Sequence, residues 1–333
     1  MKILSIIVPS YNTEQYIRKN IEYFLDKRLS EDVEIIFIND GSKDKTPEVL
    51  EEYCEKYKGY IRLVNKENGG HGSVINKGIE TAEGKYFKVI DGDDWVETEN
   101  LVRLVGYLKT SHVDAVLNAY YKIDMSRNYK KKLITAKLRQ EKVYPFDDVV
   151  GRLEQISIHM LTIKTSILRE NHIRVTENCF YDDVQYALFP VTYIDTLIYF
   201  HYPVYDYLVG QKTQSVSDAS VLKNHKMMQR ILFDSIDYYK SAVKSMSSQK
   251  KEFFITNLLI LSRQNYNIYL KNHKVKKAFD WYKEFDALYR KCAKDFYHMT
   301  QRRYPYIRAL KKSGKFGFHF IGSLLRGYKK LSG

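Results

Sequence analysis

Two hydrophobic periods alternate along the first 110 residues, and this alternation limits the fold more than any other feature of the chain. Continuous apolar runs, which are typical of strands buried on both faces, lie at residues 3–8, 33–39, 61–64 and 86–90. Helical spacing separates these runs. Pro47 suits the first turn of a helix, and the apolar residues from Leu101 to Leu108 share one face. Strands and helices in alternation predict βαβ units and a mostly parallel sheet.

Polar segments follow all four predicted strands, and three of them contain glycine. Their sequences are PSYN at 9–12, NDGS at 39–42, NKENGGHG at 65–72 and DGDD at 91–94. In an open parallel sheet, ligands bind beyond the carboxyl ends of the strands. We therefore expect a binding site at this edge of the sheet.

The remainder of the chain carries fewer motifs. Further strand-like runs lie at residues 115–123, 157–162, 197–200 and 204–208. From about residue 218 the pattern is helical, basic and rich in tyrosine. We predict an α/β sheet domain whose halves are residues 1–110 and 111–217, followed by a helical C-terminal region at 218–333. A chain of 333 residues with 44% hydrophobic residues can bury a sizeable core.

Charge is distributed unevenly. Residues 1–110 carry 16 Lys and Arg against 20 Asp and Glu, whereas residues 111–333 carry 38 against 20. A basic half attracts nucleic acid, an anionic membrane surface or phosphorylated substrates, and charge alone does not choose among them. The three cysteines include no CxxC pair, which argues against a zinc site or a disulfide framework and favours a reducing, cytosolic setting.

The acidic segment at 91–94 is the sharpest chemical feature. Asp91, Asp93 and Asp94 follow a buried strand, and adjacent carboxylates repel one another unless a cation or a turn relieves them. Mg²⁺ and Mn²⁺ prefer carboxylate oxygens and share coordination with substrate phosphates. The alternative is an acidic turn that caps a helix beginning near Thr98.

Other strand-end residues allow a functional and a structural interpretation. Asp40 can accept a hydrogen bond from a base or a ribose, or belong to a simple Asp-Gly-Ser turn. Tyr11 can stack on a base or cover the sheet edge. The glycines around Gly69 allow backbone to approach a phosphate closely, although a plain connector has the same pattern. A single loop histidine such as His71 is more often incidental than a phosphate contact.

Four of these segments, in this order, resemble the family 2 inverting glycosyltransferases, which have the GT-A fold. The segments are IIVPSYN, INDGSKDKT, NGGHGSVINKGI and GKYFKVIDGDDW. The resemblance is strong over the first 110 residues and continues more weakly to about residue 217. It implies transfer of a sugar from a nucleotide-diphosphate sugar, commonly a UDP-sugar, to a glycan or lipid-linked acceptor in bacterial surface polysaccharide assembly.

The resemblance also implies roles for individual residues. Those expected at the nucleotide sugar are Pro9, Tyr11, Asn12, Asp40, Asn68, Gly69, Asn76, Asp91, Gly92 and Lys212. Asp40 would recognise the base. Asp91 and Asp93 would form a DxD element for Mn²⁺ or Mg²⁺, with Asp93 the preferred direct ligand. Asp183 is the expected catalytic base and Asp182 the second choice, and residues 205–217 match the family's mobile loop.

Two positions depart from the family pattern. Ile75 stands where many members have an arginine, and Gln211-Lys212 stands where arginine is frequent. Lys212 is therefore the expected phosphate contact, and both changes count against uracil as the base.

A mechanism also follows from residue chemistry. A departing diphosphate needs charge stabilisation, which a divalent ion on Asp91 and Asp93 can supply, and a carboxylate must take the proton of the attacking hydroxyl. We expect Asp183 to begin a helix over residues 183–193 whose N-terminus keeps this carboxylate ionised. Simple N-capping by Asp182 and Asp183 is the alternative. A single displacement inverts the anomeric centre.

The C-terminal residues 301–333 contain nine Lys and Arg and no acidic residue. Apolar residues recur there with helical spacing at Phe320, Ile321, Leu324, Leu325 and Tyr328. The pattern fits a basic amphipathic helix on an anionic membrane, and equally a helix that packs this stripe on the protein or serves a homo-oligomer. Because neither a signal peptide nor a membrane-spanning run is apparent, we expect a cytoplasmic chain that is at most peripheral on the membrane.

Other protein classes fit less well. A dinucleotide-dependent oxidoreductase would need a GxGxxG turn where this chain has PSYN. A sugar nucleotidyltransferase would show a glycine-rich, basic loop at the same place. A nucleic-acid-binding protein would use the basic half and bind in a salt-dependent manner. A catalytically inactive sugar-binding relative would not need Asp91, Asp93 and Asp183.

Overall fold

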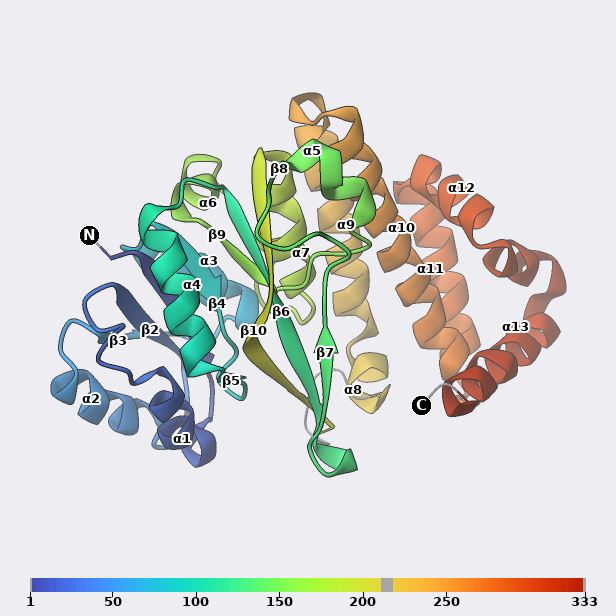
Figure 1. Ribbon diagram of the computed structural model, residues 1–333. Coiled ribbons are helices and arrows are strands. Elements are labelled where there is room, and N and C mark those ends of the chain that lie inside the picture. The colour runs from blue at the N-terminus through green and yellow to red at the C-terminus, as the bar shows by residue number, and fades with distance from the viewer. Residues whose placement is uncertain (1, 211–217, 332–333) are drawn as a thin grey trace. The chain divides into compact units, whose positions relative to one another are not determined.

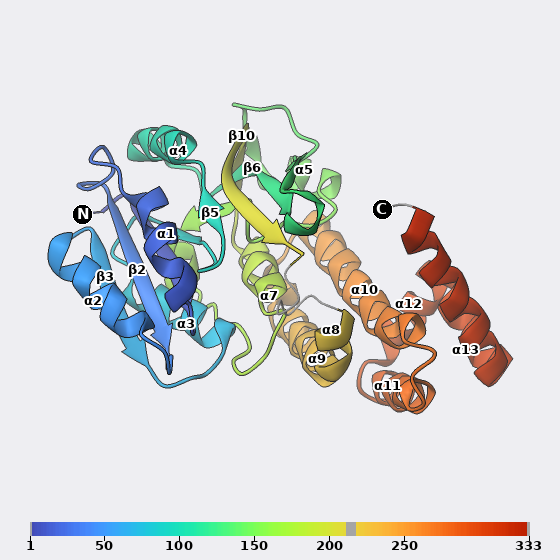
Figure 2. The ribbon, with the colours of Figure 1, turned by 90° about the horizontal axis from the view of Figure 1, so that it is seen from below.

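The computed structural model describes residues 2–210 and 218–331 of the chain (Figures 1 and 2). Two compact units are present. The sheet unit comprises Met1–Lys212 and Met246–Lys250, and the helical unit comprises Thr213–Ser245 and Lys251–Gly333. The predicted phosphate contact Lys212 and most of the predicted loop at 205–217 lie outside the described residues.

One mixed sheet organises the sheet unit. Its strands are β1 (Leu4–Ser10), β2 (Val33–Asp40), β3 (Ile61–Lys66), β4 (Tyr86–Val89), β5 (Trp95–Val96), β6 (Ala115–Asp124), β7 (Lys130–Ile134), β8 (Val143–Pro145), β9 (Leu161–Lys164) and β10 (Thr196–Val209). Along the sheet the order is β3-β2-β1-β4-β9-β6-β10-β5, with β7 paired to β6 and β8 paired to β10. β9 runs antiparallel to both of its neighbours, and the first four strands of this order are parallel.

The strand order reverses at β1. This strand pairs in parallel with β2 on one side and with β4 on the other, although β2 and β3 both lie between β1 and β4 in the chain. Where neighbouring connections leave in opposite directions, a crevice opens beyond the carboxyl ends of the strands. The structure therefore confirms the α/β fold and brings the ends of β1, β2 and β4 to one edge.

Helices cover both faces of the parallel part. In the sheet unit they are α1 (Glu14–Phe24), α2 (Thr46–Lys56), α3 (His71–Thr81), α4 (Thr98–Thr110), α5 (Phe146–Val149), α6 (Thr165–Glu170) and α7 (Asp183–Leu188). Alternate β1 residues Leu4 and Ile6 join the core formed with α1, α2 and α4. Ile7 points to the other face, where a Cβ on Gly78 of α3 would lie 2.8 Å from it.

Two predicted strands differ from the structure. Residues 157–160 form a turn, in which the Met160 amide donates to the Ser157 carbonyl, and the strand begins only at Leu161. The two runs at 197–200 and 204–208 form one strand, β10, with register shifts on either side of Pro203. Proline has no amide to donate, so the ladder is interrupted there without ending the strand.

The helical unit confirms the helical prediction for the C-terminal region. Its helices are α8 (Asp218–Lys223), α9 (His225–Ala242), α10 (Ser248–Lys271), α11 (Ala278–Cys292), α12 (Lys294–Arg303) and α13 (Pro305–Leu331). Tyrosines fill its core, and the hydroxyl of buried Tyr266 donates to Asp286 while that of Tyr289 bonds with Ser262. Among the described residues, no helix combines the length and the apolar character that crossing a bilayer requires.

Candidate functional site

The loops after β1 and β2 are held together by Asn12. Its backbone amide donates to the Ser42 hydroxyl at 3.0 Å, and its side-chain oxygen accepts from the Lys43 amide at 2.8 Å. Tyr11, beside it, is 48% exposed. Its ring is therefore accessible at the crevice, as an aromatic platform for a base must be.

Gly92 follows β4 and lies directly against Pro9 of β1. A Cβ at this position would lie 2.4 Å from the Pro9 carbonyl oxygen, and the Asn20 side chain donates to the Gly92 carbonyl from the other direction. Only glycine allows this approach of the two backbones. The predicted nucleotide-binding residues Pro9 and Gly92 thus lie side by side, where they bring the acidic segment next to the β1 loop.

Asp40 is a buried organising carboxylate at the end of β2. It accepts hydrogen bonds from the amides of Gly69 at 2.9 Å and Gly70 at 2.8 Å, and it forms an ion pair with Lys66 at 2.7 Å. The Asn68 side chain donates to the Asp40 carbonyl at 2.8 Å. Asp40 therefore shapes the glycine-rich loop, and these bonds occupy most of the acceptor positions with which it would recognise a base.

His71, the first residue of α3, bridges two carboxylates from distant parts of the chain. Its Nε2 lies 3.0 Å from Asp91 Oδ1, and its Nδ1 lies 3.0 Å from Asp182 Oδ2. Burial alone would lower the pKa of His71, but the charge of Asp182 and the bonds with both carboxylates hold that pKa well above its ordinary value. The ring is therefore an imidazolium at neutral pH that donates from both nitrogens.

Asp91 is kept ionised by this contact. Burial raises its pKa, and the hydrogen bond and charge of His71 outweigh that effect, so the pKa of Asp91 lies below its ordinary value. The Tyr205 hydroxyl of β10 accepts from the Asp91 amide at 3.0 Å and lies 3.2 Å from Asp91 Oδ2. An ionised, partly exposed carboxylate is suited to a divalent cation.

Asp94 has a different environment. The Asp94 side chain is buried. It accepts hydrogen bonds from the Tyr205 hydroxyl at 2.6 Å and from the Leu208 amide at 2.8 Å. Burial and the charges of Asp93 and Asp91 raise the pKa of Asp94 well above its ordinary value. Asp94 therefore holds β10 against the acidic segment. Within that segment, Asp94 has a structural role.

Three potential metal-binding side chains meet here. Ligand atoms of Asp91, Asp94 and His159 lie within 4.8 Å of one another. Burial lowers the pKa of His159 to about 4, so its imidazole is neutral, the form that binds metals. Carboxylate and imidazole together suit Mn²⁺. Asp93, the predicted direct ligand, is partly exposed and lies outside this group.

Asp182 and Asp183 stand at the beginning of α7. Burial and the neighbouring charge of Asp182 raise the pKa of Asp183 to about 6. This carboxylate is therefore still mostly ionised at neutral pH, but burial, and not the helix N-terminus, dominates its pKa. α7 ends at Leu188 and continues as a 3-10 turn over Phe189–Thr192, which makes it shorter than predicted. Asp182 is buried at the N-cap position without a side-chain capping bond, which removes simple capping as its explanation.

Asn76 has a structural environment. Its buried side-chain amide donates to the Val175 carbonyl at 2.9 Å and to Glu177 at 2.8 Å, and its oxygen accepts from the Val175 amide at 2.9 Å. All of these bonds join α3 to the segment before α7. The geometry thus gives no support to a nucleotide contact by Asn76.

Sequence reasoning missed three members of the site, namely His71, His159 and Tyr205. His71 was interpreted as a loop residue that is more often incidental, His159 lies in a region predicted as strand, and Tyr205 was assigned to a strand-like run and to the start of a mobile loop but to no role in the site. No local spacing connects them, because His71 and Asp182 are 111 residues apart. The one sequence signal that could have identified these contacts is covariation between distant positions in related sequences.

Known proteins resemble part of this chain in sequence. The sequence model of the family described as glycosyl transferase family 2 matches residues 5–175. EpsJ of Bacillus subtilis strain 168, an uncharacterized glycosyltransferase, is 38% identical over 125 residues, which are 38% of this chain and 36% of that protein. A teichoic acid poly(glycerol phosphate) polymerase of Staphylococcus epidermidis is 27% identical over 270 residues, which are 78% of this chain and 35% of that protein.

The fold has solved counterparts as well. The crystal structure of S. aureus TarS 1–349 in complex with UDP-GlcNAc superposes with a TM-score of 0.68 over 98% of this chain and 92% of that chain, at 16% identity. The chain spans little more than a third of the length of the curated relatives EpsJ and the polymerase. Because the family match covers more than half of the 333 residues, the chain belongs to glycosyl transferase family 2.

Proposed function

We propose that this chain transfers a sugar, with inversion, from a nucleotide-diphosphate sugar to an acceptor hydroxyl during synthesis of a cell-surface polymer. One observation carries the proposal. The acidic segment after β4 and the carboxylates at the start of α7 meet across His71, through two contacts of 3.0 Å. A transferase of this kind needs a charged group near the leaving diphosphate and a proton acceptor near the hydroxyl.

The donor is proposed to be a UDP-sugar. TarS was crystallised with UDP-GlcNAc, and Tyr11 offers an exposed ring beside the β1 loop in this chain. Asp40, Asn68 and Gly69 are joined by hydrogen bonds at the end of β2, and they would hold the nucleoside largely through the backbone that they order. For the acceptor we propose a glycan or a lipid-linked carrier, in line with the polymer that the S. epidermidis relative is named for.

A divalent cation, Mn²⁺ or Mg²⁺, would be held by Asp91 and Asp93, with His159 as a further donor. When bound, such an ion neutralises charge that develops on the departing diphosphate. The protein's own contribution is to keep Asp91 ionised through His71 and to fix its backbone through Tyr205.

Asp183 is the proposed catalytic base. Its pKa of about 6 lies close to neutral pH, which suits a group that must be deprotonated beforehand and still accept a proton in the transition state. Asp182 is committed to His71 and is proposed to orient that ring. Asp183 thus takes the proton of the acceptor hydroxyl while the same hydroxyl oxygen attacks the anomeric carbon and the diphosphate leaves.

A screen of nucleotide sugars tests the proposal. The purified chain is heated with each donor in the presence of Mn²⁺ or of EDTA, and release of the nucleoside diphosphate is followed by chromatography. We expect one donor to raise the Tm only with the metal and to be consumed. Asp91→Asn should lose this thermal shift, whereas Asp183→Asn should keep it and lose turnover. Absence of any metal-dependent donor binding, or full turnover by both variants, contradicts the proposal.

A further inference from the structure

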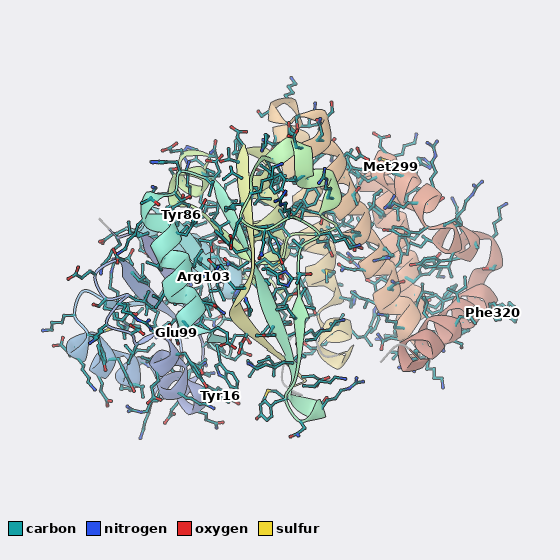
Figure 3. All side chains as sticks on the ribbon, viewed as in Figure 1. Tyr16, Tyr86, Glu99, Arg103, Met299 and Phe320 are labelled. Carbon is teal, nitrogen blue, oxygen red and sulfur yellow. The ribbon has the colours of Figure 1, made fainter. Side chains whose placement is uncertain are left out.

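The second segment of α13 exposes an apolar stripe. α13 bends at Gly314, which has a positive φ of 58°, so that two helical segments meet there. Beyond the bend, Phe316 is 81% exposed, Phe320 58% and Leu324 59%. Their spacing of four residues places them on one face. The rings of Phe316 and Phe320 stack at 6.5 Å between centroids, and Figure 3 shows Phe320 pointing away from its helix bundle.

A different face of the same segment packs on the protein. Phe318 is fully buried, with its ring 5.3 Å from Phe279 and 5.4 Å from Tyr282 of α11. A Cβ on Gly322 would lie 2.5 Å from the Leu270 carbonyl oxygen, so this glycine lets the helix approach α10 closely. The packing alternative for α13 is thus satisfied without the exposed stripe.

The predicted stripe of Phe320, Ile321, Leu324, Leu325 and Tyr328 is corrected accordingly. Phe320 and Leu324 face solvent, whereas Ile321 and Leu325 lie at the boundary and are partly buried. Phe316 joins the stripe, and the side chain of Tyr328 lies outside the described residues. The packing stripe and the exposed stripe are separate faces, a distinction that helical spacing alone could not make.

Basic side chains are exposed along α13, on both sides of the bend at Gly314. Those exposed on α13 are Arg308, Lys311, Lys312, Lys315 and Arg326, and the chain contains no acidic residue after Asp295. A second copy of the same face would therefore meet it with like charge, which opposes self-association. A surface with anionic groups outside and an apolar layer below them complements both the basic side chains and the apolar stripe.

We propose that the stripe of Phe316, Phe320 and Leu324 inserts into the interface of an anionic lipid bilayer, with the exposed lysines and arginines of α13 at the headgroups. Apolar side chains that enter the headgroup boundary gain burial, and each nearby Lys or Arg adds attraction to anionic lipid. This inference rests on α13 alone and is independent of the proposed reaction. It would give the chain a place at the surface where a lipid-linked acceptor is found.

Co-sedimentation of the full chain with vesicles tests this binding. Vesicles of phosphatidylcholine with about one third phosphatidylglycerol are compared with pure phosphatidylcholine, each at low and high salt. We expect the anionic vesicles to bind the chain and high salt to weaken binding. Phe316→Ser/Phe320→Ser/Leu324→Ser and Lys311→Gln/Lys312→Gln/Lys315→Gln should each weaken binding at least about tenfold. Both variants should retain the Tm and the donor-induced thermal shift of the unmodified chain.

Val275→Ser/Leu288→Ser is the matched control, because both residues are exposed in the same unit and lie outside α13. This variant should bind like the unmodified chain. Equal recovery on anionic and neutral vesicles, or full binding by the apolar variant, overturns the proposal. So does lipid-free dimerisation that the apolar substitutions abolish, since the stripe would then belong to a second copy.

Discussion

The His71 ring lies between Asp91 and Asp182, with one nitrogen 3.0 Å from each carboxylate. The three residues come from the start of α3, the end of β4 and the start of α7. A protonated ring shared by two carboxylates fixes their separation, and it holds the pKa of Asp91 below its ordinary value in a partly buried site. His71 thus connects Asp91, on the proposed donor side of the site, with Asp182, on the proposed acceptor side.

Replacement of this ring should impair turnover more than folding. In His71→Gln, one neutral amide cannot donate to both carboxylates and supplies no positive charge. We expect kcat to fall by about ten- to a hundredfold with a smaller change in the donor KM, because an oriented, ionised Asp91 matters most as charge develops. Steady-state kinetics measure both constants. His112→Gln, at an exposed histidine of the same unit, should have no effect; equal losses in the two variants would count against a positioning role.

Asp183→Asn should remove the proton acceptor and leave donor binding intact. We expect kcat to fall by about a thousandfold, within the usual range for loss of a general base, and the metal-dependent thermal shift by the donor to persist. Asp182→Asn should retain more activity than Asp183→Asn, since Asp182 acts through His71. If the order of the two variants is reversed, Asp182 is the base.

The pH dependence should follow Asp183. Because the pKa of Asp183 in the ligand-free chain is about 6, we expect kcat/KM to rise with pH through about 6 and then level off, since only the ionised carboxylate accepts a proton. A pH–rate profile of the full chain gives the apparent pKa directly. A flat profile between about pH 5 and 7 would remove Asp183 from this role.

The same raised pKa has an effect on stability. The folded chain holds the Asp183 proton more tightly than the unfolded chain, so this contribution to stability is present below the unfolded value and is lost as pH rises through about 6. Asp183→Asn should therefore have a Tm equal to or above that of the unmodified chain at pH 7.5, while it loses turnover. Thermal melts at acidic and neutral pH check the sign.

The acidic segment should separate into ligand and structural parts. Asp91→Asn and Asp93→Ala should lose the metal-dependent donor shift, as should treatment of the unmodified chain with EDTA. Asp94→Asn should keep most of that shift, because the raised pKa of Asp94 already favours an uncharged group that an amide imitates. Thermal-shift titrations with Mn²⁺ compare the three. Loss of metal response in Asp94→Asn alone would identify Asp94 as the ligand.

Gly92→Ala should destabilise the sheet unit. The added Cβ would lie 2.4 Å from the Pro9 carbonyl oxygen, so the ends of β1 and β4 must move apart, at a cost of about 1 to 3 kcal/mol. Gly106→Ala is the control, since this glycine lies inside α4 with no atom within 4 Å of an added Cβ. That change should stabilise by about 0.5 to 1 kcal/mol. Urea unfolding of both variants measures the difference.

Local sequence pattern predicted the strands that carry the site. Nearly every residue of β1, β2 and β4 is buried, whereas most of β3 is only partly buried. Burial of the first kind depends on period and composition within a few residues. Ser157 and His159 show where this reasoning ends. The sequence pattern predicts a strand at these residues. In the structure, a hydrogen bond joins their side chains within a turn, and local side-chain contacts of this kind compete with the hydrogen bonds of a sheet.

Only part of the site could be predicted from the sequence, because local pattern shows where strands end but not which side chains meet. The four strand-end segments were identified because a parallel sheet brings its carboxyl ends to one edge, a rule that needs no knowledge of side-chain contacts.

The sequence by itself thus determined the α/β fold, the edge that carries Asp40 and Asp91, and the helical nature of the C-terminal region. Only the tertiary structure decided that His71 joins Asp91 to Asp182, that Asp94 holds Tyr205, and that Phe316 and Phe320 are exposed while Phe318 is buried. Secondary structure follows from neighbours in the chain. Ionisation and exposure are set instead by residues outside the local segment, 20 positions apart for His71 and Asp91 and 111 for His71 and Asp182, which fold into contact and exclude water.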